Sequence, residues 1–80
     1  MQTEQVKARE DLAEFVHQLC HQLQQSPDSW EHRTLPEYLE AMASWTKDMD
    51  GWYLNRGETV PEQPTWTTLA QILSAATMYE

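Results

Sequence analysis

Apolar residues recur at helical spacing in the first third of the chain. Between positions 4 and 24 they lie three or four residues apart, and charged or amide side chains fill most of the other positions. The apolar set comprises Val6, Leu12, Phe15, Val16, Leu19 and Leu23. This pattern predicts one amphipathic helix. The helix should end before Pro27, because the residue before a proline is disfavoured in the helical region. Ser26-Pro27-Asp28 predicts a turn or one short helical turn, and Trp30 should then anchor the chain in the core.

A second helix is predicted from position 34 onward. Thr34-Leu35-Pro36-Glu37 matches a capping box, in which the threonine hydroxyl and the glutamate carboxylate each accept a hydrogen bond from the other residue's backbone N–H. Its apolar stripe comprises Tyr38, Leu39, Met42, Ala43, Trp45 and Met49. Asp50-Gly51 predicts the end of this helix, because glycine commonly follows a helix C-terminus.

The remaining segment predicts a short helical turn, a loop and a last helix. Trp52-Tyr53-Leu54 is too apolar to leave in water and predicts a helical turn packed on the other helices. Asn55-Arg56-Gly57 predicts a turn, and 61–64 favours extended backbone. Thr65 is the expected cap of a helix that runs to the C-terminus. Its apolar positions are Trp66, Leu69, Ala70, Ile72, Leu73, Ala76, Thr77 and Tyr79.

These elements predict an all-α fold: a small bundle of three main helices plus a short helical turn before the last helix. Eighty residues are enough for one domain, spanning 1–80, because two cores would each be too small to remain folded. Large aromatic side chains should supply much of the core. The aromatic candidates are Trp30, Tyr38, Trp45, Trp52, Trp66 and Tyr79, and Trp45 and Trp66 in particular are expected to be core residues.

The charge of the chain excludes some partners. Thirteen acidic and five basic residues give a net charge of -8, which opposes binding to nucleic acid and to anionic membranes. It suits a protein partner with a basic surface, or serves solubility alone. No apolar run is long enough to span a bilayer, and positions 1–10 do not resemble a signal peptide. With a single cysteine the chain can form no internal disulfide, so a cytoplasmic location is expected.

One group of residues is a candidate for metal binding. His17, Cys20 and His21 are spaced so that they can share one side of a helix and chelate a transition metal, but they do not complete a tetrahedral site. No nucleophile with a base, and no carboxylate pair in a cleft, is indicated. We therefore expect no enzymatic activity and no cofactor. Metal or small-ligand binding through His17, Cys20 and His21 stays an alternative.

The segment 45–55 is the candidate binding surface. It combines Trp45 and the Trp52-Tyr53 pair with the charged residues Asp48 and Asp50, which is the composition of an interface hot spot surrounded by polar groups. A packed corner of the fold has the same composition. Trp45 is expected in the core, whereas one of Trp52 and Tyr53 is expected to point inward and the other to be exposed.

The sequence resembles a family of short bacterial proteins of unknown function. The resemblance covers about residues 30–80 and is most specific in Glu40-Ala41-Met42-Ala43-Ser44-Trp45 and in Asp50-Gly51-Trp52-Tyr53. The family brings no known activity with it.

In layout alone the chain is also similar to the immunity proteins of nuclease colicins, which block toxins through acidic residues and a tyrosine pair. This likeness implies that Trp52 and Tyr53 would anchor a partner, although a tryptophan stands where the first tyrosine would be. It also implies a set of steering charges, namely Glu37, Glu40, Asp48 and Asp50. The leading hypothesis is therefore a non-enzymatic protein-binding module of immunity or inhibitor type. A structural homodimer that associates through the uncharged last helix is a further alternative.

Overall fold

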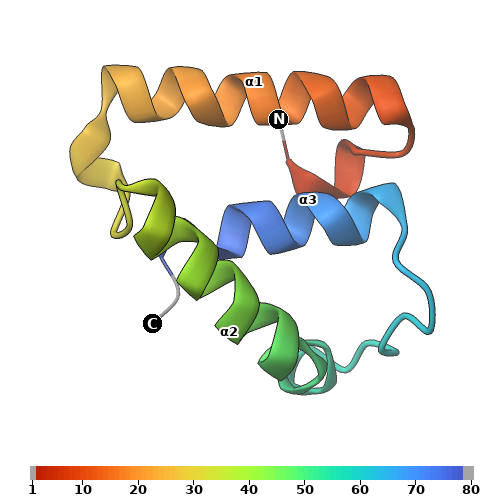
Figure 1. Ribbon diagram of the computed structural model, residues 1–80. Coiled ribbons are helices and arrows are strands. Elements are labelled where there is room, and N and C mark those ends of the chain that lie inside the picture. Colours follow the sequence, from red (N-terminus) through yellow and green to blue (C-terminus); the bar gives the residue numbers. More distant parts are fainter. Residues whose placement is uncertain (1, 79–80) are drawn as a thin grey trace.

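Three helices form the frame of the protein in the computed structural model, which describes residues 2–78 (Figure 1). They are α1 (Arg9–Gln25), α2 (Leu35–Asn55) and α3 (Trp66–Ala75), with single 3-10 turns at η1 (Thr3–Gln5) and η2 (Pro27–Ser29). The described part of the chain contains no strand. The predicted all-α fold with three main helices is therefore confirmed.

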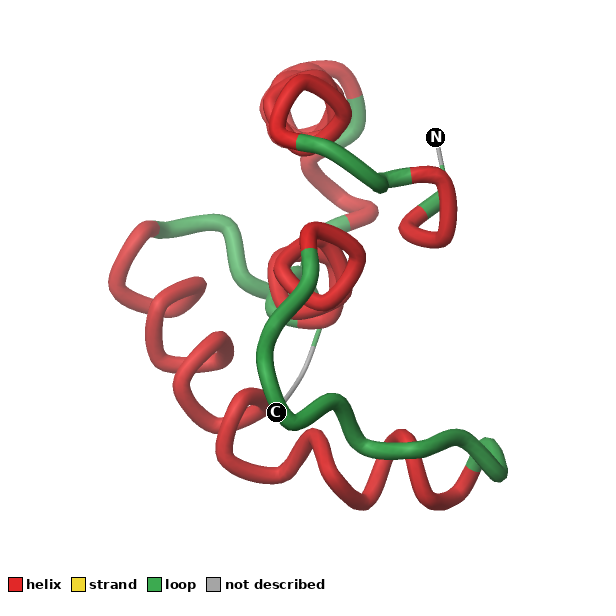
Figure 2. The backbone as a smooth tube through the Cα atoms, turned by 90° about the vertical axis from the view of Figure 1, so that its right-hand side faces the viewer, coloured by secondary structure: helices red, strands yellow, loops and turns green. Residues whose placement is uncertain are grey.

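Helix α3 lies at the centre of the arrangement. Helix α1, helix α2 and η1 each pack on α3, and α1 also contacts η2. Figure 2 looks nearly along α1 and α3 at once, so these two helices run side by side, whereas α2 crosses at a different angle. An uncharged helix suits this central position, because a charged side chain would lose its hydration there. This arrangement explains why α3 contains no acidic or basic residue.

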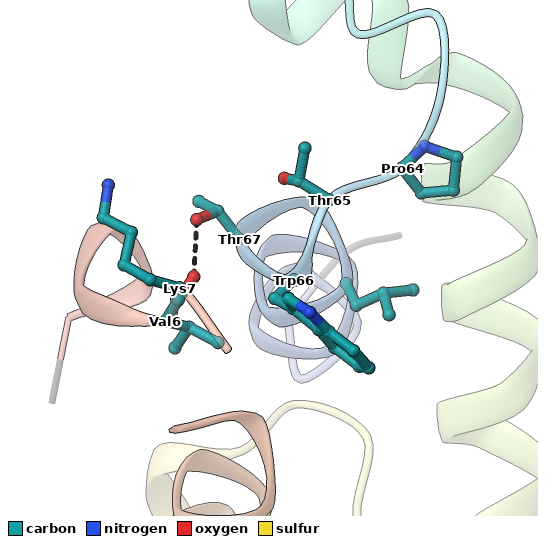
Figure 3. A pocket seen from close by; sticks show the side chains of 7 residues that line it. Val6, Lys7, Pro64, Thr65, Trp66 and Thr67 are labelled. Atoms are coloured by element: carbon teal, nitrogen blue, oxygen red, sulfur yellow. Dashed lines mark hydrogen bonds between the residues drawn. The ribbon is translucent and has the colours of Figure 1, made fainter. Parts of the chain in front are cut away.

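The N-terminal residues do not belong to the first helix. Helix α1 begins at Arg9 rather than near position 4, and Val6 and Ala8 have extended backbone. The resulting N-terminal strap, residues 2–8, folds back on α3. There the Val6 side chain is fully buried, and the Val6 carbonyl accepts a hydrogen bond of 2.6 Å from Thr67 Oγ1 (Figure 3). The periodicity prediction was wrong at this point, because burial of Val6 and the bond to Thr67 favour leaving the helix.

One part of the core lies where the strap, α1 and α3 meet. Val6, Phe15 and Ala70 are buried together there. The half-buried residues packed against them are Leu12, Leu19 and Leu73. Ala70 has no exposed surface, and its small side chain lets Phe15 and Val6 approach the backbone of α3.

The rest of the core joins α2 to α3. Trp45 and Tyr53 of α2 are buried, and the Tyr53 hydroxyl donates a hydrogen bond to Gln71 Oε1 on α3. Trp30 is buried as predicted. Trp66, however, is 39% exposed, so its assignment to the core was wrong. Trp66 lies in the first turn of α3 and lines an open hollow next to Val6 and Lys7 (Figure 3).

Helix α2 does not stop at Gly51. It continues to Asn55, so the helical turn predicted at 52–54 is the last turn of α2 rather than a separate element. A glycine inside a helix costs only about 1 kcal/mol, which the burial of Tyr53 outweighs. Gly57 follows the end of the helix, and its φ of +72° allows the Glu58 and Gly57 amides to donate to the carbonyls of Tyr53 and Leu54, respectively.

Both predicted N-terminal caps are present. Thr34 Oγ1 accepts from the Glu37 amide at 3.4 Å, and Glu37 Oε1 accepts from the Thr34 amide at 3.3 Å, which completes the capping box of α2. Thr65 Oγ1 accepts from the Thr68 amide at 3.1 Å and caps α3. Helix α3 ends at Ala75 rather than continuing to the C-terminus, and Tyr79, predicted as a core residue, lies outside the described residues.

Candidate functional site

A groove separates α1 from the beginning of α2. Both helices pack on α3 rather than on each other, and η2 with residues 30–34 joins them at one end (Figure 1). The groove encloses about 410 Å³. It is lined by Val16, Leu19 and Leu23 of α1, by Trp30, His32, Arg33 and Thr34 of the connection, by Leu35 and Tyr38 of α2, and by Leu73 of α3. We call it the α1–α2 groove.

The walls of the groove carry exposed apolar side chains. Val16 is 45% exposed and Leu35 is 68% exposed. Leu39, one helical turn after Leu35, is 50% exposed and extends the apolar surface along α2. Isolated exposed leucines are ordinary, but several that border one groove are typical of a surface that a partner covers. The α1–α2 groove is therefore the best candidate for a binding site.

Tyr38 and Trp30 form the aromatic part of the lining. Their rings stack with centroids 5.6 Å apart. The Tyr38 hydroxyl donates a hydrogen bond of 2.8 Å to the Leu73 carbonyl and thereby ties the beginning of α2 to α3. Burial raises the pKa of Tyr38 to about 12. The groove therefore has a fixed aromatic floor.

Alkaline pH is expected to destabilise the protein through Tyr38. An unfolded tyrosine ionises near pH ~10, whereas folded Tyr38 keeps its proton until about pH 12. Between these values the unfolded state binds fewer protons, so the free energy of unfolding should fall as pH rises. Tyr38→Phe should show a shallower fall, with the remainder due to Tyr53, whose pKa is also raised by burial. Urea denaturation between about pH 9 and pH 11 measures this, and identical slopes in both proteins would contradict it.

The donors of the groove lie in the connection between α1 and α2. Arg33 Nε donates to the Trp30 carbonyl at 3.2 Å, and Arg33 Nη2 pairs with Asp28 Oδ1 at 3.2 Å. The indole N–H of Trp30 is buried and has no hydrogen-bond partner among the described residues. The described lining includes no Asp or Glu, although the chain has thirteen acidic residues. Among the described residues, the lining of this end therefore contains a cation and no acid, and the acid nearest the cation is Asp28, which pairs with Arg33 outside the lining.

The predicted binding corner around Trp52 and Tyr53 is mostly closed. Tyr53 is only 3% exposed, so its assignment to a partner-binding site was wrong. Trp52 is half-buried, makes edge contacts with the rings of Trp45 and Tyr53, and is covered by the Arg56 guanidinium 4.5 Å from its ring centre. Arg56 is itself paired with Glu58 at 2.9 Å. The aromatic pair thus packs α2 on α3, and the inward position expected for one ring is taken by Tyr53.

The four predicted steering charges do not form one cluster. Because α2 is continuous, Asp48 and Asp50 point about 160° apart around the helix, and they lie about 16 to 20 Å along the helix from Glu37. Glu37 belongs to the capping box, where hydrogen bonds from the side chain and the backbone of Thr34 lower its pKa. Glu40, Asp48 and Asp50 are exposed along the helix. These acids contribute to the overall field of the protein rather than to one binding corner.

The remaining candidates do not form a site. His17, Cys20 and His21 are exposed on α1, and residues 2–78 contain no group of three or more His, Cys, Asp or Glu side chains that could hold a metal ion.

A shallow hollow of about 670 Å³ beside Trp66 and Lys7 lies between the strap and the beginning of α3 (Figure 3). The hydrogen bond that the Thr67 hydroxyl donates to the Val6 carbonyl lies in this hollow and holds the strap on α3.

Sequence reasoning missed the groove, although one signal pointed to it. Val16 directly follows Phe15, and two consecutive residues of a helix cannot both face the same neighbour. Leu35 likewise precedes the main stripe of α2 by a full turn. Neither Val16 nor Leu35 is needed for the contact with α3, and both stay exposed. Their meeting in one groove follows only from the placement of α1 and α2 around α3.

Comparisons with known proteins give a family but no activity. The searches of curated proteins and of solved structures found no match. Within residues 2–78, no helix has both the length and the apolar character needed to cross a membrane. A family model matches residues 8–80, which takes in all three helices. The chain therefore belongs to DUF7660, a family of unknown function.

Proposed function

We propose that this protein is a non-enzymatic protein-binding module whose α1–α2 groove receives an amphipathic helix of a partner protein. One observation carries the proposal: α1 and α2 both pack on α3 and leave an apolar groove between them, bordered by the exposed side chains of Val16 and Leu35. A helix laid into such a groove buries its apolar face and already satisfies its own backbone hydrogen bonds.

The walls of the groove match the surface of a helix. On α1, Val16, Leu19 and Leu23 follow one another at intervals of three and four residues and form a ridge. On α2, Leu35 lines the opposite wall, and Leu39, four residues later and outside the lining, continues its ridge along the helix. A helix placed between these ridges would complete a four-helix arrangement around the same apolar interior.

The charge of the protein favours a different protein over a second copy. Each copy carries a net charge of -8, so two copies repel each other as they approach, whereas a partner with a basic surface is attracted. The exposed acids Glu40, Asp48 and Asp50 on α2 add to this attraction without lining the groove. In this proposal the acidic surface speeds encounter, and the groove provides the affinity.

An inhibitor of immunity type would therefore act through the groove. The colicin-like arrangement needs an exposed aromatic anchor after Gly51, and Tyr53 is buried. Leu35 and Val16 supply the exposed apolar surface instead. The single cysteine, Cys20, is exposed and unpaired, which is compatible with action in a reducing cytoplasm.

Polar substitutions in the groove are expected to weaken partner binding without unfolding the protein. Val16→Gln and Leu35→Gln should each weaken binding by about tenfold or more, because each removes apolar surface that the partner would cover. The partner is first recovered by co-purification from the native host, and its affinity for the purified chain is then measured by calorimetry. Thermal denaturation verifies that each variant is folded.

Leu54→Gln is the matched control for this experiment. Leu54 is 65% exposed on the last turn of α2 and does not line the groove. Its replacement should leave the affinity unchanged. The proposal fails if the chain recovers no partner and stays monomeric, or if the groove variants bind as well as the control. Sedimentation at high concentration separates a homodimer from these outcomes.

A further inference from the structure

We infer that the helix bound in the α1–α2 groove carries a carboxylate side chain at the end of the groove formed by Trp30, His32 and Arg33. The inference rests on the proposed function and adds the chemistry of the partner segment. Residues 30–34 connect α1 to α2, so this donor-rich end is where the two walls of the groove meet (Figure 1).

The charge of the lining is the first line of evidence. Arg33 is one of only five basic residues in the chain, and no Asp or Glu lines the groove within the described residues. The remainder of the surface is dominated by acids, so a carboxylate on a partner is disfavoured almost everywhere else. Beside Arg33 it meets a planar guanidinium, whose N–H groups match the geometry of a carboxylate.

Arg33 is able to accept this second carboxylate. Its side chain is 53% exposed, and the side chain of its present partner, Asp28, is 97% exposed. Exposed ion pairs of this kind are weak, so a carboxylate in the less hydrated groove competes well for the guanidinium. Nε and Nη2 of Arg33 already donate to Trp30 and Asp28, and the guanidinium has further N–H groups at Nη1.

Trp30 provides the second, independent observation. It is 7% exposed, it lines the groove, and its indole N–H has no hydrogen-bond partner among the described residues. A buried donor without an acceptor is rare and unfavourable in a folded protein. Trp30 therefore adds a buried donor without an acceptor to the end of the groove that holds Arg33, and the exposed guanidinium is the group that a carboxylate reaches first.

Three model peptides test this inference on the full chain. Each is a 14-residue amphipathic helix without tryptophan, about 21 Å long, with leucines at intervals of three and four residues. The peptides differ at one position, beyond the leucine stripe, which carries Glu, Gln or Lys. An NMR titration of the isotope-labelled protein measures each dissociation constant and shows which residues the peptide contacts.

The Glu peptide is expected to bind about tenfold more tightly than the Lys peptide, with the Gln peptide between them. Arg33→Gln should bring all three affinities to nearly the same value. Lys47→Gln, which removes an exposed positive charge of α2 away from the groove, should keep the order. Both variants lose one positive charge, so the comparison separates a local effect of Arg33 from the overall charge.

Each other outcome overturns the inference in a distinguishable way. Equal affinities for the Glu and Lys peptides would refute the carboxylate while leaving helix binding intact. The same preference in Arg33→Gln would refute the role of Arg33. Tighter binding of decanoate than of any peptide, with displacement of the peptide, would show that the groove takes a free amphiphile. Failure of all three peptides to shift groove resonances would refute helix binding itself, and the inference with it.

Discussion

Phe15→Ala is expected to lower the free energy of unfolding by about 3 to 5 kcal/mol, the usual cost of deleting a buried aromatic ring. Phe15 is 5% exposed and packs with Val6 and Ala70 where the strap, α1 and α3 meet. An 80-residue domain of ordinary stability has only about 4 to 12 kcal/mol in total. The loss is therefore a large share of the total stability, and urea denaturation followed by circular dichroism measures it.

Val16→Ala is the control for Phe15→Ala. It removes apolar atoms from the adjacent position of the same helix, but Val16 is 45% exposed. Its effect on the free energy of unfolding should stay within about 0.5 to 1 kcal/mol, as for exposed positions generally. Comparable losses in both variants would mean that Phe15 does not anchor α1 on α3, and would require a different packing of this helix.

Val6→Asp is expected to lower the free energy of unfolding by about 2 to 3 kcal/mol and to release the N-terminal strap from α3. Val6 has no exposed surface, and a carboxylate there would have no cation beside it in the buried cluster. The loss is limited because the strap can detach, which gives up the burial of one valine and the hydrogen bond from Thr67. Urea denaturation measures the loss, and proteolysis should cleave the variant first within residues 2–8.

Gln5→Glu adds the same charge one residue earlier in the strap, where the side chain is exposed, and keeps the oxygen that accepts from the Gln2 amide. It should leave the proteolysis pattern and the free energy of unfolding nearly unchanged. Cleavage at the same rate in wild type and in Val6→Asp would show that the strap is not held by Val6.

The strap runs along α3 but does not line the groove. It contacts α3 through Val6 near Thr67 and Ala70, and Thr3 and Glu4 lie beside Ser74 and Ala75, whereas the groove is formed by α1, the connection, α2 and Leu73 of α3. Val6→Asp should therefore affect stability more than partner binding, and Leu35→Gln the reverse. This separation lets experiments distinguish a binding defect from an unfolded chain.

Local chemistry in the sequence determined the three helices and three of their six ends. Thr34 and Glu37 form a capping box because both partners lie within one turn, and Thr65 caps α3 for the same reason. Pro27 ends α1 and begins a single turn through the fixed geometry of its ring. Such interactions span at most four residues, so a linear pattern contains everything needed to predict them.

Gly51 and Val6 show where local reasoning fails. Gly51 is a plausible helix end by itself, but α2 continues because Tyr53 gains more by packing on α3 than the glycine costs. Val6 fits the period of α1, yet it lies outside the helix. Its side chain is buried against α3, and its carbonyl accepts a hydrogen bond from the Thr67 hydroxyl. In both cases the deciding partner lies far along the chain.

The candidate site was decided by tertiary structure alone. The sequence showed that Val16, Leu35 and Leu39 are apolar, but periodicity cannot state whether another helix covers them. That depends on the angle at which α1 and α2 cross α3, and α3 can contact only part of each helix. For the aromatic pair the same packing has the opposite effect: it buries Tyr53 and half-buries Trp52. Apolar character is a property of each residue, whereas exposure is a property of how the helices meet.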